Sequence, residues 1–227
     1  MLSKSLEIGF TLLLVVMVPA LSLATTRQAE IRALPRLAIY SSAVLSEWLV
    51  TAIGGAVVMV ASTKLSVAGF EVCSLAAFAG WAAGLAGLSL AGLGAVLMAE
   101  RRGWLQEESE LVRLLMPATL KEKLWAALLV APTAGFCEEF LYRGFLLSLL
   151  SQWCHSVGWG WVLSSVVFGF AHTYQGVSGM IRVMLMGVLL AYPAVHLGSL
   201  YPSMAAHFLI DAVALVWLGP RFLRQRD

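Results

Sequence analysis

The sequence predicts an all-α fold, a polytopic transmembrane helix bundle of about seven spans. Sixty per cent of the 227 residues are hydrophobic and 12% are charged, which is about half the charged fraction of a soluble domain. The mean hydropathy is +0.85. Apolar runs near the roughly 20 residues that cross a bilayer recur along the chain. Because hydrocarbon offers backbone groups no water, such runs have to be helical. Residues 1–227 are therefore expected to form one integral membrane domain.

Each expected span follows from one apolar run. The first run, Ile8 to Ala24, could be taken for a signal peptide, but its flanking arginines follow the run. This is the wrong side for a cleaved signal, so we interpret the run as the first span. The expected spans are 6–25, 38–62, 73–98, 121–150, 157–173, 179–198 and 203–219.

A more polar segment separates the third and fourth spans. Within residues 104–117, apolar side chains alternate with charged ones. This pattern is typical of an amphipathic helix that lies at the membrane surface. If this helix instead enters the membrane, the bundle has eight spans.

Basic residues divide unequally between the two sides of the predicted bundle. Cytoplasmic loops of membrane proteins carry an excess of Lys and Arg. The rule therefore places the N-terminus outside and the C-terminus in the cytoplasm, in a bacterial inner membrane or the endoplasmic reticulum. The predicted cytoplasmic side receives Arg27, Arg32, Arg36, Arg101, Arg102, Arg113, Lys121, Lys123, Arg182, Arg221, Arg224 and Arg226, and the other side Lys4 and Lys64.

The net charge and the cysteines indicate neither nucleic-acid binding nor a zinc site. The net charge is +2, and no basic tract is long enough to indicate a nucleic-acid partner. Cys73, Cys137 and Cys154 lie in or beside apolar segments, without a CxxC or a Cys/His pair typical of zinc. We expect the three cysteines to be small buried hydrophobic residues.

The main functional signal is a group of ionisable side chains inside the predicted spans. Such residues cost about 2.5 kcal/mol or more on insertion scales and mark functional sites. The fourth span contains Glu138, Glu139 and Arg143 in the segment GFCEEFLYRGFL. Glu139 and Arg143 are one helical turn apart and can pair as i, i+4. This pairing leaves the carboxylate of Glu138 free to titrate.

Two later spans also carry polar side chains at helical spacing. The fifth span ends in FGFAH, with Phe168 and His172 one turn apart, and the last begins with HFLID, with His207 and Asp211 on one face. Together with Glu138, these groups can activate a water by general base catalysis or hold a metal with an open position. The predicted topology puts the two histidines near opposite ends of their spans. For both to meet Glu138, the fifth or seventh span has to be broken, tilted or sunk.

Each of these residues also has an ordinary structural interpretation. A single histidine or aspartate in a membrane often bonds only to a neighbouring helix, and the Glu–Arg pair of the fourth span is more typical of structure than of chemistry. His155 and His196 are expected to be interfacial or packing residues. Glu47, in the second span, is expected to face a cavity or satisfy a polar contact. Cys137 has no histidine near it in the sequence, so it is a weak candidate for a nucleophile.

Taken in order, the late motifs resemble those of the CPBP family of intramembrane proteases, which includes the CAAX prenyl endopeptidases and bacteriocin-processing or immunity proteins. The motifs are EExxxR from Glu138 to Arg143, FxxxH from Phe168 to His172, and HxxxD from His207 to Asp211. The resemblance covers roughly residues 120–220, the expected catalytic helices. Each motif is short, but three in order at these spacings are quite specific.

The resemblance implies a role for each motif residue. Glu138 would be the catalytic base and His172 would assist it, while His207 and Asp211 would stabilise the oxyanion or complete the site. Family members commonly have Asn at the position of Asp211, and an Asp donates a hydrogen bond only when it is protonated. No cofactor is implied unless the chemistry uses a divalent metal, which the same four residues would then hold. The supporting residues would be Glu139, Arg143 and Phe168.

The predicted function is therefore that of an intramembrane endopeptidase, of the glutamic or metal-dependent type, acting through a water activated by glutamate and histidine. Its partners would be the lipid bilayer and a membrane-anchored protein or peptide: a prenylated tail, a peptide precursor or the C-terminal anchor of a surface protein. One alternative is a proton or metal transporter, which predicts broken helices and internal repeats, and no repeat is visible. Another is a non-enzymatic immunity or binding protein, against which the intact motifs argue.

Overall fold

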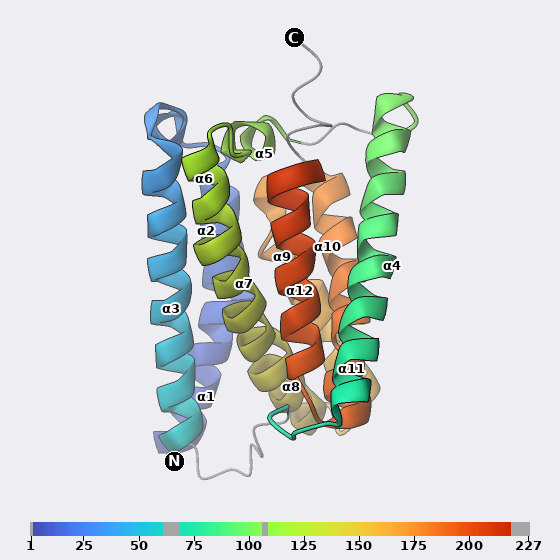
Figure 1. Cartoon of the computed structure of the whole chain (residues 1–227). Helices are drawn as coiled ribbons and strands as arrows, with labels where there is room; N and C mark the ends of the chain where they lie inside the picture. The colour runs from blue at the N-terminus through green and yellow to red at the C-terminus, as the bar shows by residue number, and fades with distance from the viewer. Residues whose placement is uncertain (1, 61–68, 106–108, 219–227) are drawn as a thin grey trace.

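Within residues 2–60, 69–105 and 109–218, which the computed structural model describes, the chain is almost entirely helical. Six helical rods in these residues are long and apolar enough to cross a membrane, and a seventh apolar helix is shorter. The rods stand side by side (Figure 1). The prediction of an all-α polytopic membrane bundle is confirmed.

Most of the rods combine several helical segments in one continuous column. The first rod consists of α1 (Leu2–Leu12), η1 (Leu13–Met17) and α2 (Val18–Thr25). After the short η2 (Ala29–Ala33), α3 (Arg36–Val60) forms the second rod, and α4 (Leu75–Arg101) forms the third. After the short α5 (Glu110–Leu115), the fourth rod consists of α6 (Leu120–Trp125), η3 (Ala126–Val130), α7 (Ala131–Glu138), η4 (Glu139–Leu146) and α8 (Leu147–Trp153). The fifth rod is α9 (Val157–Phe170). The sixth consists of η5 (Thr173–Gln175), α10 (Gly176–Leu190) and α11 (Tyr192–Leu197), and the seventh of α12 (Tyr201–Val213) with η6 (Ala214–Leu218).

Capping side chains determine where several of these helices begin. Ser74, Ser109 and Ser156 each accept a hydrogen bond from the backbone N–H three residues further on, at the starts of α4, α5 and α9. Thr119 and Glu122 form a capping box at the start of α6. These bonds satisfy backbone donors that a helix leaves open at its N-terminus. The turns between the rods are therefore specified locally.

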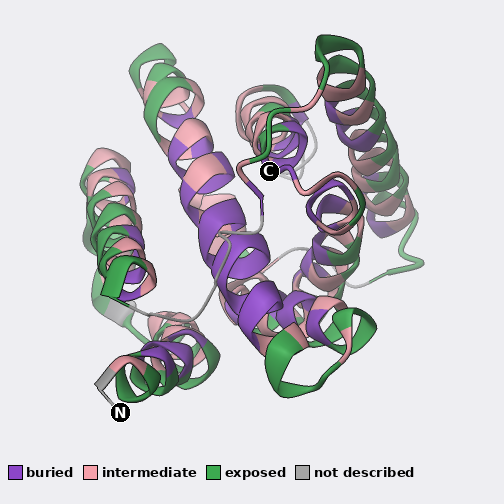
Figure 2. Ribbon diagram, turned by 90° about the horizontal axis from the view of Figure 1, so that it is seen from below, coloured by how far each residue is buried: buried purple, intermediate pink, exposed green. Residues whose placement is uncertain are grey.

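The fourth rod is the centre of the bundle. Every residue of its π-helical segment η4 is buried, and this rod is the purple column through the middle of Figure 2. Large apolar side chains on the outer rods, such as Leu45 and Met59 of α3 and Leu75 of α4, are exposed. An outward apolar surface is what contact with lipid tails requires. The almost completely buried Glu139 and Arg143 belong to this central rod.

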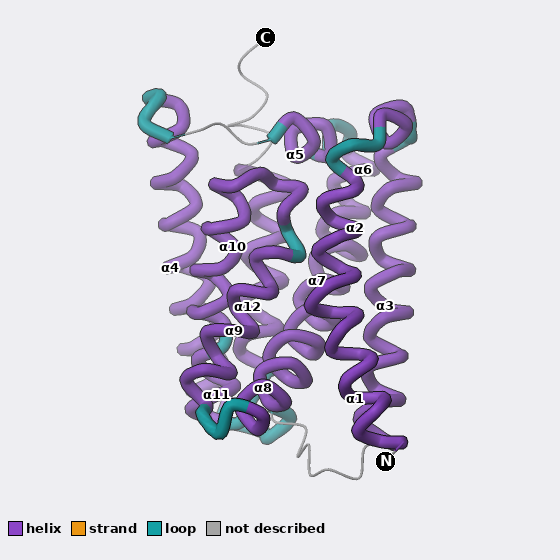
Figure 3. The backbone as a smooth tube through the Cα atoms, turned by 180° about the vertical axis from the view of Figure 1, so that it is seen from behind, coloured by secondary structure: helices purple, strands orange, loops and turns teal. Residues whose placement is uncertain are grey.

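The fifth rod is shorter than expected. The sequence predicted a span over 157–173, but α9 ends at Phe170, after 14 residues. At 1.5 Å per residue it is about 21 Å long, less than the roughly 30 Å hydrocarbon core. The chain turns at η5 and continues into α10, and Figure 3 shows this connection, in teal, between the rods and not beyond their ends. The other expected spans agree with the rods to within a few residues.

The surface helix expected over 104–117 is also shorter in the structure. Residues 104 and 105 are not helical, residues 106–108 lie outside the described part, and α5 covers Glu110–Leu115. This helix lies across one end of the bundle (Figure 1). Because α5 has 6 residues, the described residues contain no eighth span in this region.

Successive rods run in alternate directions, so α1 begins at one face of the bundle and α12 ends towards the opposite face (Figure 1). The basic segments at the latter face are the α2–α3 connection, the end of α4, α5 and the start of α6. Of the basic residues in the predicted charge distribution, Arg182 lies within α10 and not in a connection. Lys64, Arg221, Arg224 and Arg226 lie outside the described residues. The orientation with the N-terminus outside stays a prediction. The basic residues in these segments are Arg27, Arg32, Arg36, Arg101, Arg102, Arg113, Lys121 and Lys123.

Candidate active site

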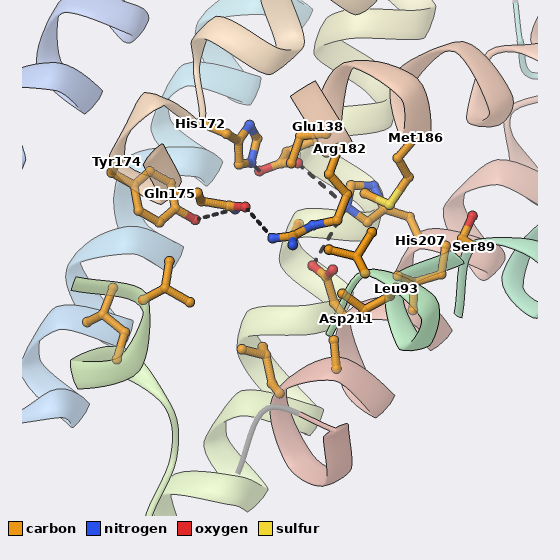
Figure 4. A pocket seen from close by; sticks show the side chains of 18 of the residues that line it. Ser89, Leu93, Glu138, His172, Tyr174, Gln175, Arg182, Met186, His207 and Asp211 are labelled. Carbon is orange, nitrogen blue, oxygen red and sulfur yellow. Dashed lines mark hydrogen bonds and ion pairs between the residues drawn. The ribbon is translucent and has the colours of Figure 1, made fainter. Parts of the chain in front are cut away.

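Glu138, at the end of α7, lies where three rods meet. Its Oε1 is 3.7 Å from Nε2 of His172, and its Oε2 is 3.6 Å from Nε2 of His207. Asp211 adds a carboxylate oxygen 3.6 Å from the same His207 nitrogen. Figure 4 shows Glu138 between the two histidines. The structure therefore brings together all four residues that the motifs singled out.

The separations around Glu138 are longer than direct hydrogen bonds. Protein N–H···O bonds span about 2.7–3.2 Å, whereas the contacts of Glu138 with His172 and His207 measure 3.7 and 3.6 Å. Polar groups at such separations are commonly bridged by water. The cluster therefore leaves room for a small polar molecule to be held between a carboxylate and two imidazoles.

His172 reaches this depth because α9 is short. The residue lies two positions after the end of that helix, in the turn before η5. The close approach of α9 to α10 depends on Gly169, where an added Cβ would lie 2.9 Å from the backbone oxygen of Met180 and closer still to Met184. The sequence required the fifth or seventh span to be broken, tilted or sunk for both histidines to meet Glu138. In the structure the fifth span is truncated and ends inside the bundle.

A backbone contact determines the tautomer of His172. Its Nδ1 lies 2.8 Å from the carbonyl oxygen of Phe168. Since a carbonyl only accepts hydrogen bonds, Nδ1 has to carry the proton. Neutral His172 therefore presents an unprotonated Nε2 to Glu138, and this nitrogen can accept a proton or a hydrogen bond.

Two serines outside the motifs hold the turn that carries His172. Ser22 Oγ, in α2, accepts hydrogen bonds from Thr173 Oγ1 at 3.0 Å and from the Tyr174 backbone N–H at 3.2 Å. Ser109 Oγ donates to the Tyr174 carbonyl oxygen at 2.9 Å. These residues were missed in the sequence, because nothing in their local pattern relates them to a turn far along the chain.

The second half of the site is anchored by Glu139. Its Oε1 accepts a hydrogen bond from Nδ1 of His207 at 2.8 Å and lies 3.0 Å from Nη1 of Arg143. Glu139, Arg143 and His207 expose 0%, 1% and 2% of their surfaces. The expected pair of Glu139 and Arg143 is present, but the same carboxylate also orients the imidazole of His207. A carboxylate in this position fixes the ring and stabilises its protonated form.

Phe168 packs between these charged and polar groups. It is fully buried, and the guanidinium carbon of Arg143 lies 4.1 Å from its ring centroid. Its ring also lies 4.8 Å from that of His172 and 6.1 Å from that of His207. A cation over an aromatic face is stabilised by the ring quadrupole. Phe168 thus packs against the buried arginine and both histidines and limits how their side chains can turn.

The site opens into a cavity of about 890 Å³, with walls from α3, α4, α7, α10 and α12. Most of its lining side chains are apolar, which is typical of pockets that bind organic ligands. On one wall, Gln175 donates to the Tyr174 hydroxyl at 3.2 Å and accepts from Arg182 at 3.3 Å, as Figure 4 shows. Beyond the four motif residues, the polar lining consists of Tyr40, Glu47, Ser89, Tyr174, Gln175, Ser178 and Arg182.

The remaining candidates lie away from the cluster. His155 is exposed in the turn between α8 and α9, and His196 packs against the rings of Tyr192 and Trp161. Neither histidine lines the cavity. The expectation that all cysteines are buried was wrong in part, because Cys137 is buried, Cys73 is half-buried and Cys154 is exposed. Cys154 lies in the turn after α8.

Metal binding was expected only if the chemistry required it. Among the described residues, no group of three or more His, Cys, Asp and Glu side chains is arranged to hold a metal ion. The conditional metal set was Glu138, His172, His207 and Asp211, and three contacts within it measure 3.6–3.7 Å. Metal dependence stays a matter for experiment.

Comparison with known proteins gives one match. Residues 120–213 match the family model described as type II CAAX prenyl endopeptidase Rce1-like. The match begins at α6 and ends with α12, so it contains all three motifs. The first three rods, and with them Ser22 and Glu47, lie outside it. Neither the curated proteins nor the solved structures include a match to the chain.

Proposed function

We propose that Glu138 and His172 activate the water that hydrolyses a peptide substrate of this chain. Residues 120–213 form a domain of the Rce1-like type II CAAX prenyl endopeptidase family, and the chain is thereby an intramembrane protease. The whole chain would act as one membrane domain, with the catalytic motifs on helices within 120–220. The match to an endopeptidase family favours this function over a transporter, and the intact motifs favour it over an immunity protein.

The observation that carries the proposal is the convergence of Glu138 and His172 on the cavity. Their facing atoms are 3.7 Å apart, and Nδ1 of His172 is occupied by the Phe168 carbonyl. A water between them would donate one hydrogen bond to the Glu138 carboxylate and one to Nε2 of His172. Both of its protons would then be oriented, and a lone pair would point into the cavity, as general base catalysis requires.

The proposed reaction uses Glu138 as a proton shuttle. As the water oxygen bonds to the substrate carbonyl carbon, Glu138 takes one water proton and the carbonyl π electrons move to the oxygen. When the tetrahedral intermediate collapses, the C–N bond breaks and Glu138 returns that proton to the leaving amine. The products are a carboxylic acid and an amine, and the protein is regenerated without a cofactor.

His207 is the proposed oxyanion partner. Its Nδ1–H is held by Glu139, so in the imidazolium form Nε2–H faces Glu138 and the cavity. A preorganised donor of this kind stabilises the charge that develops on the carbonyl oxygen. Asp211, 3.6 Å from the same Nε2, would favour the imidazolium and so act through His207. This role needs no hydrogen bond donated by an aspartate.

The proposed substrates are membrane-associated peptides: a prenylated tail, a peptide precursor or the C-terminal anchor of a surface protein. The largely apolar walls of the cavity suit a chain that enters from the lipid. We also propose that the face with the basic α2–α3 connection, α5 and the start of α6 is cytoplasmic, in line with the positive-inside rule.

The test is cleavage of candidate membrane-anchored peptides by the full chain in liposomes. We expect Glu138→Gln to abolish cleavage, with a loss of at least about a hundredfold, and chelator to leave the wild type active. The matched control is Glu30→Gln, which changes an exposed glutamate in η2. Cleavage that persists in Glu138→Gln would contradict the role of the base, and loss of wild-type cleavage with chelator would indicate a metal.

A further inference from the structure

A third carboxylate faces the cavity from α3. Glu47 lines the cavity together with Glu138 and Asp211. Its Oε2 atom is shielded from solvent and has no hydrogen-bond partner among the described residues. Because α3 lies outside residues 120–213, the family match assigns Glu47 no role.

Contacts on both sides of Glu47 hold it in this position. The next residue, Trp48, donates from its indole N–H to Thr133 Oγ1 of α7 at 3.1 Å and stacks on Phe136 with ring centroids 5.4 Å apart. Two turns earlier, the Tyr40 hydroxyl donates to a backbone carbonyl at the end of α5, at 2.6 Å. These bonds fix the rotation and the height of α3 against its neighbours. With α3 held in this rotation, Glu47 faces the cavity.

The charges around the cavity favour a cationic ligand. Glu138 and Asp211 lie close enough for their negative charges to act on Glu47, and each has a larger effect there than the opposing charge of His207. Like charges repel more strongly where water is scarce. Among the described residues that line the cavity, Arg182 is the one Lys or Arg, and it donates to Gln175. A buried carboxylate is costly unless a donor or a positive charge reaches it. An entering basic group would supply both.

We propose that Glu47 is a specificity-determining residue that binds a Lys or Arg side chain of the peptide substrate near the scissile bond. The inference rests on the proposed function, because it places the scissile bond at Glu138. The ammonium or guanidinium group donates to Glu47 Oε2 and offsets the negative charge of the cavity. A substrate with a neutral side chain leaves that oxygen without a donor, so it is cleaved less efficiently.

The experiment compares matched peptides in liposomes that contain the full chain. Membrane-anchored peptides differ at one position only, which carries Lys or the uncharged norleucine and is moved through the three residues on either side of the scissile bond. We expect kcat/KM to favour Lys by about tenfold or more at one position. Glu47→Gln should remove that preference, and Glu47→Lys should reverse it towards a Glu-containing peptide. Glu30→Gln is the matched control and should keep the preference.

A binding measurement separates failure of this inference from failure of the proposed function. The same peptides are titrated into Glu138→Gln protein in nanodiscs, with and without Glu47→Gln, so that no cleavage is needed. Tighter binding of the Lys peptide that depends on Glu47 supports the inference even if no peptide is cut. Equal binding of Lys and norleucine peptides overturns it. A preference for the Lys peptide that survives Glu47→Gln also overturns it. So does a loss of affinity in that variant that is equal for both peptides.

Discussion

The carboxylate of Glu139, in η4, accepts a hydrogen bond from Nδ1 of His207, in α12, across 2.8 Å. Both side chains are almost completely buried, and the same carboxylate pairs with Arg143 at 3.0 Å. The second glutamate of the EExxxR motif thus supports the histidine of the HxxxD motif. The two adjacent glutamates have different environments: Glu138 faces the cavity, whereas Glu139 connects two rods.

Removing the Glu139 carboxylate should lower the stability of the bundle. Glu139→Ala leaves the guanidinium of Arg143 buried without its counter-charge, and breaking a buried pair costs about 3–5 kcal/mol. Thermal unfolding in detergent would measure the change. The double variant Glu139→Leu with Arg143→Leu should lose clearly less stability than the sum of the single variants. Additive losses would contradict a coupled pair.

Asp211 should act through its charge and its polarity. Asp211→Asn removes the negative charge that favours the imidazolium of His207 but keeps a polar side chain beside its Nε2, so kcat/KM should fall by about tenfold. Asp211→Leu removes every polar contact and should lower kcat by about a hundredfold or more, as loss of oxyanion stabilisation does. Steady-state cleavage of one anchored peptide by both variants is the measurement. Equal activity of the Leu variant and the wild type would exclude Asp211 from the site.

Ser22, which lies outside the residues that match the family model, should affect the reaction rate through the turn that carries His172. Ser22→Ala removes the acceptor of two hydrogen bonds that hold the turn next to His172. Because small displacements of catalytic groups are costly, kcat should fall by about tenfold with little change in KM, and Ser22→Thr should restore part of it. Ser46→Ala, at an exposed site on α3, is the control. If Ser22→Ala changes only thermal stability, its role is structural.

Gly169 should be intolerant of any side chain. In Gly169→Ala the new Cβ would meet the Met180 carbonyl at 2.9 Å and overlap Met184, so α9 has to move away from α10. Overpacking of this kind costs about 1–3 kcal/mol, and the shift would carry His172 away from Glu138. Gly158→Ala on the same helix has its nearest neighbour at 3.8 Å and should be neutral. Unfolding temperature and cleavage rate of both variants test this, and similar behaviour of the two would refute it.

Much of the architecture was predictable because it depends on local rules. Apolar runs in lipid have to be helical, so six of the seven rods agree with the expected spans to within a few residues. The contacts of Glu139 with Arg143 and of His207 with Asp211 both join residues four apart, which helical geometry places on one face. The sequence required the fifth or seventh span to be broken, tilted or sunk, but it did not predict that α9 ends at Phe170. Gly176, which adopts a φ of +83°, is the residue type that such a turn favours.

The sequence by itself determined that this protein is a membrane-spanning helix bundle, and which late residues form its polar cluster, because hydropathy and helical spacing act over short distances along the chain. Only the tertiary structure decided which of these side chains meet. The bond between Glu139 and His207, the support of the His172 turn by Ser22, and the orientation of Glu47 towards the cavity depend on how separate rods pack. Each of these contacts joins segments far apart in the chain, and no local pattern encodes the relative rotation and depth of two helices.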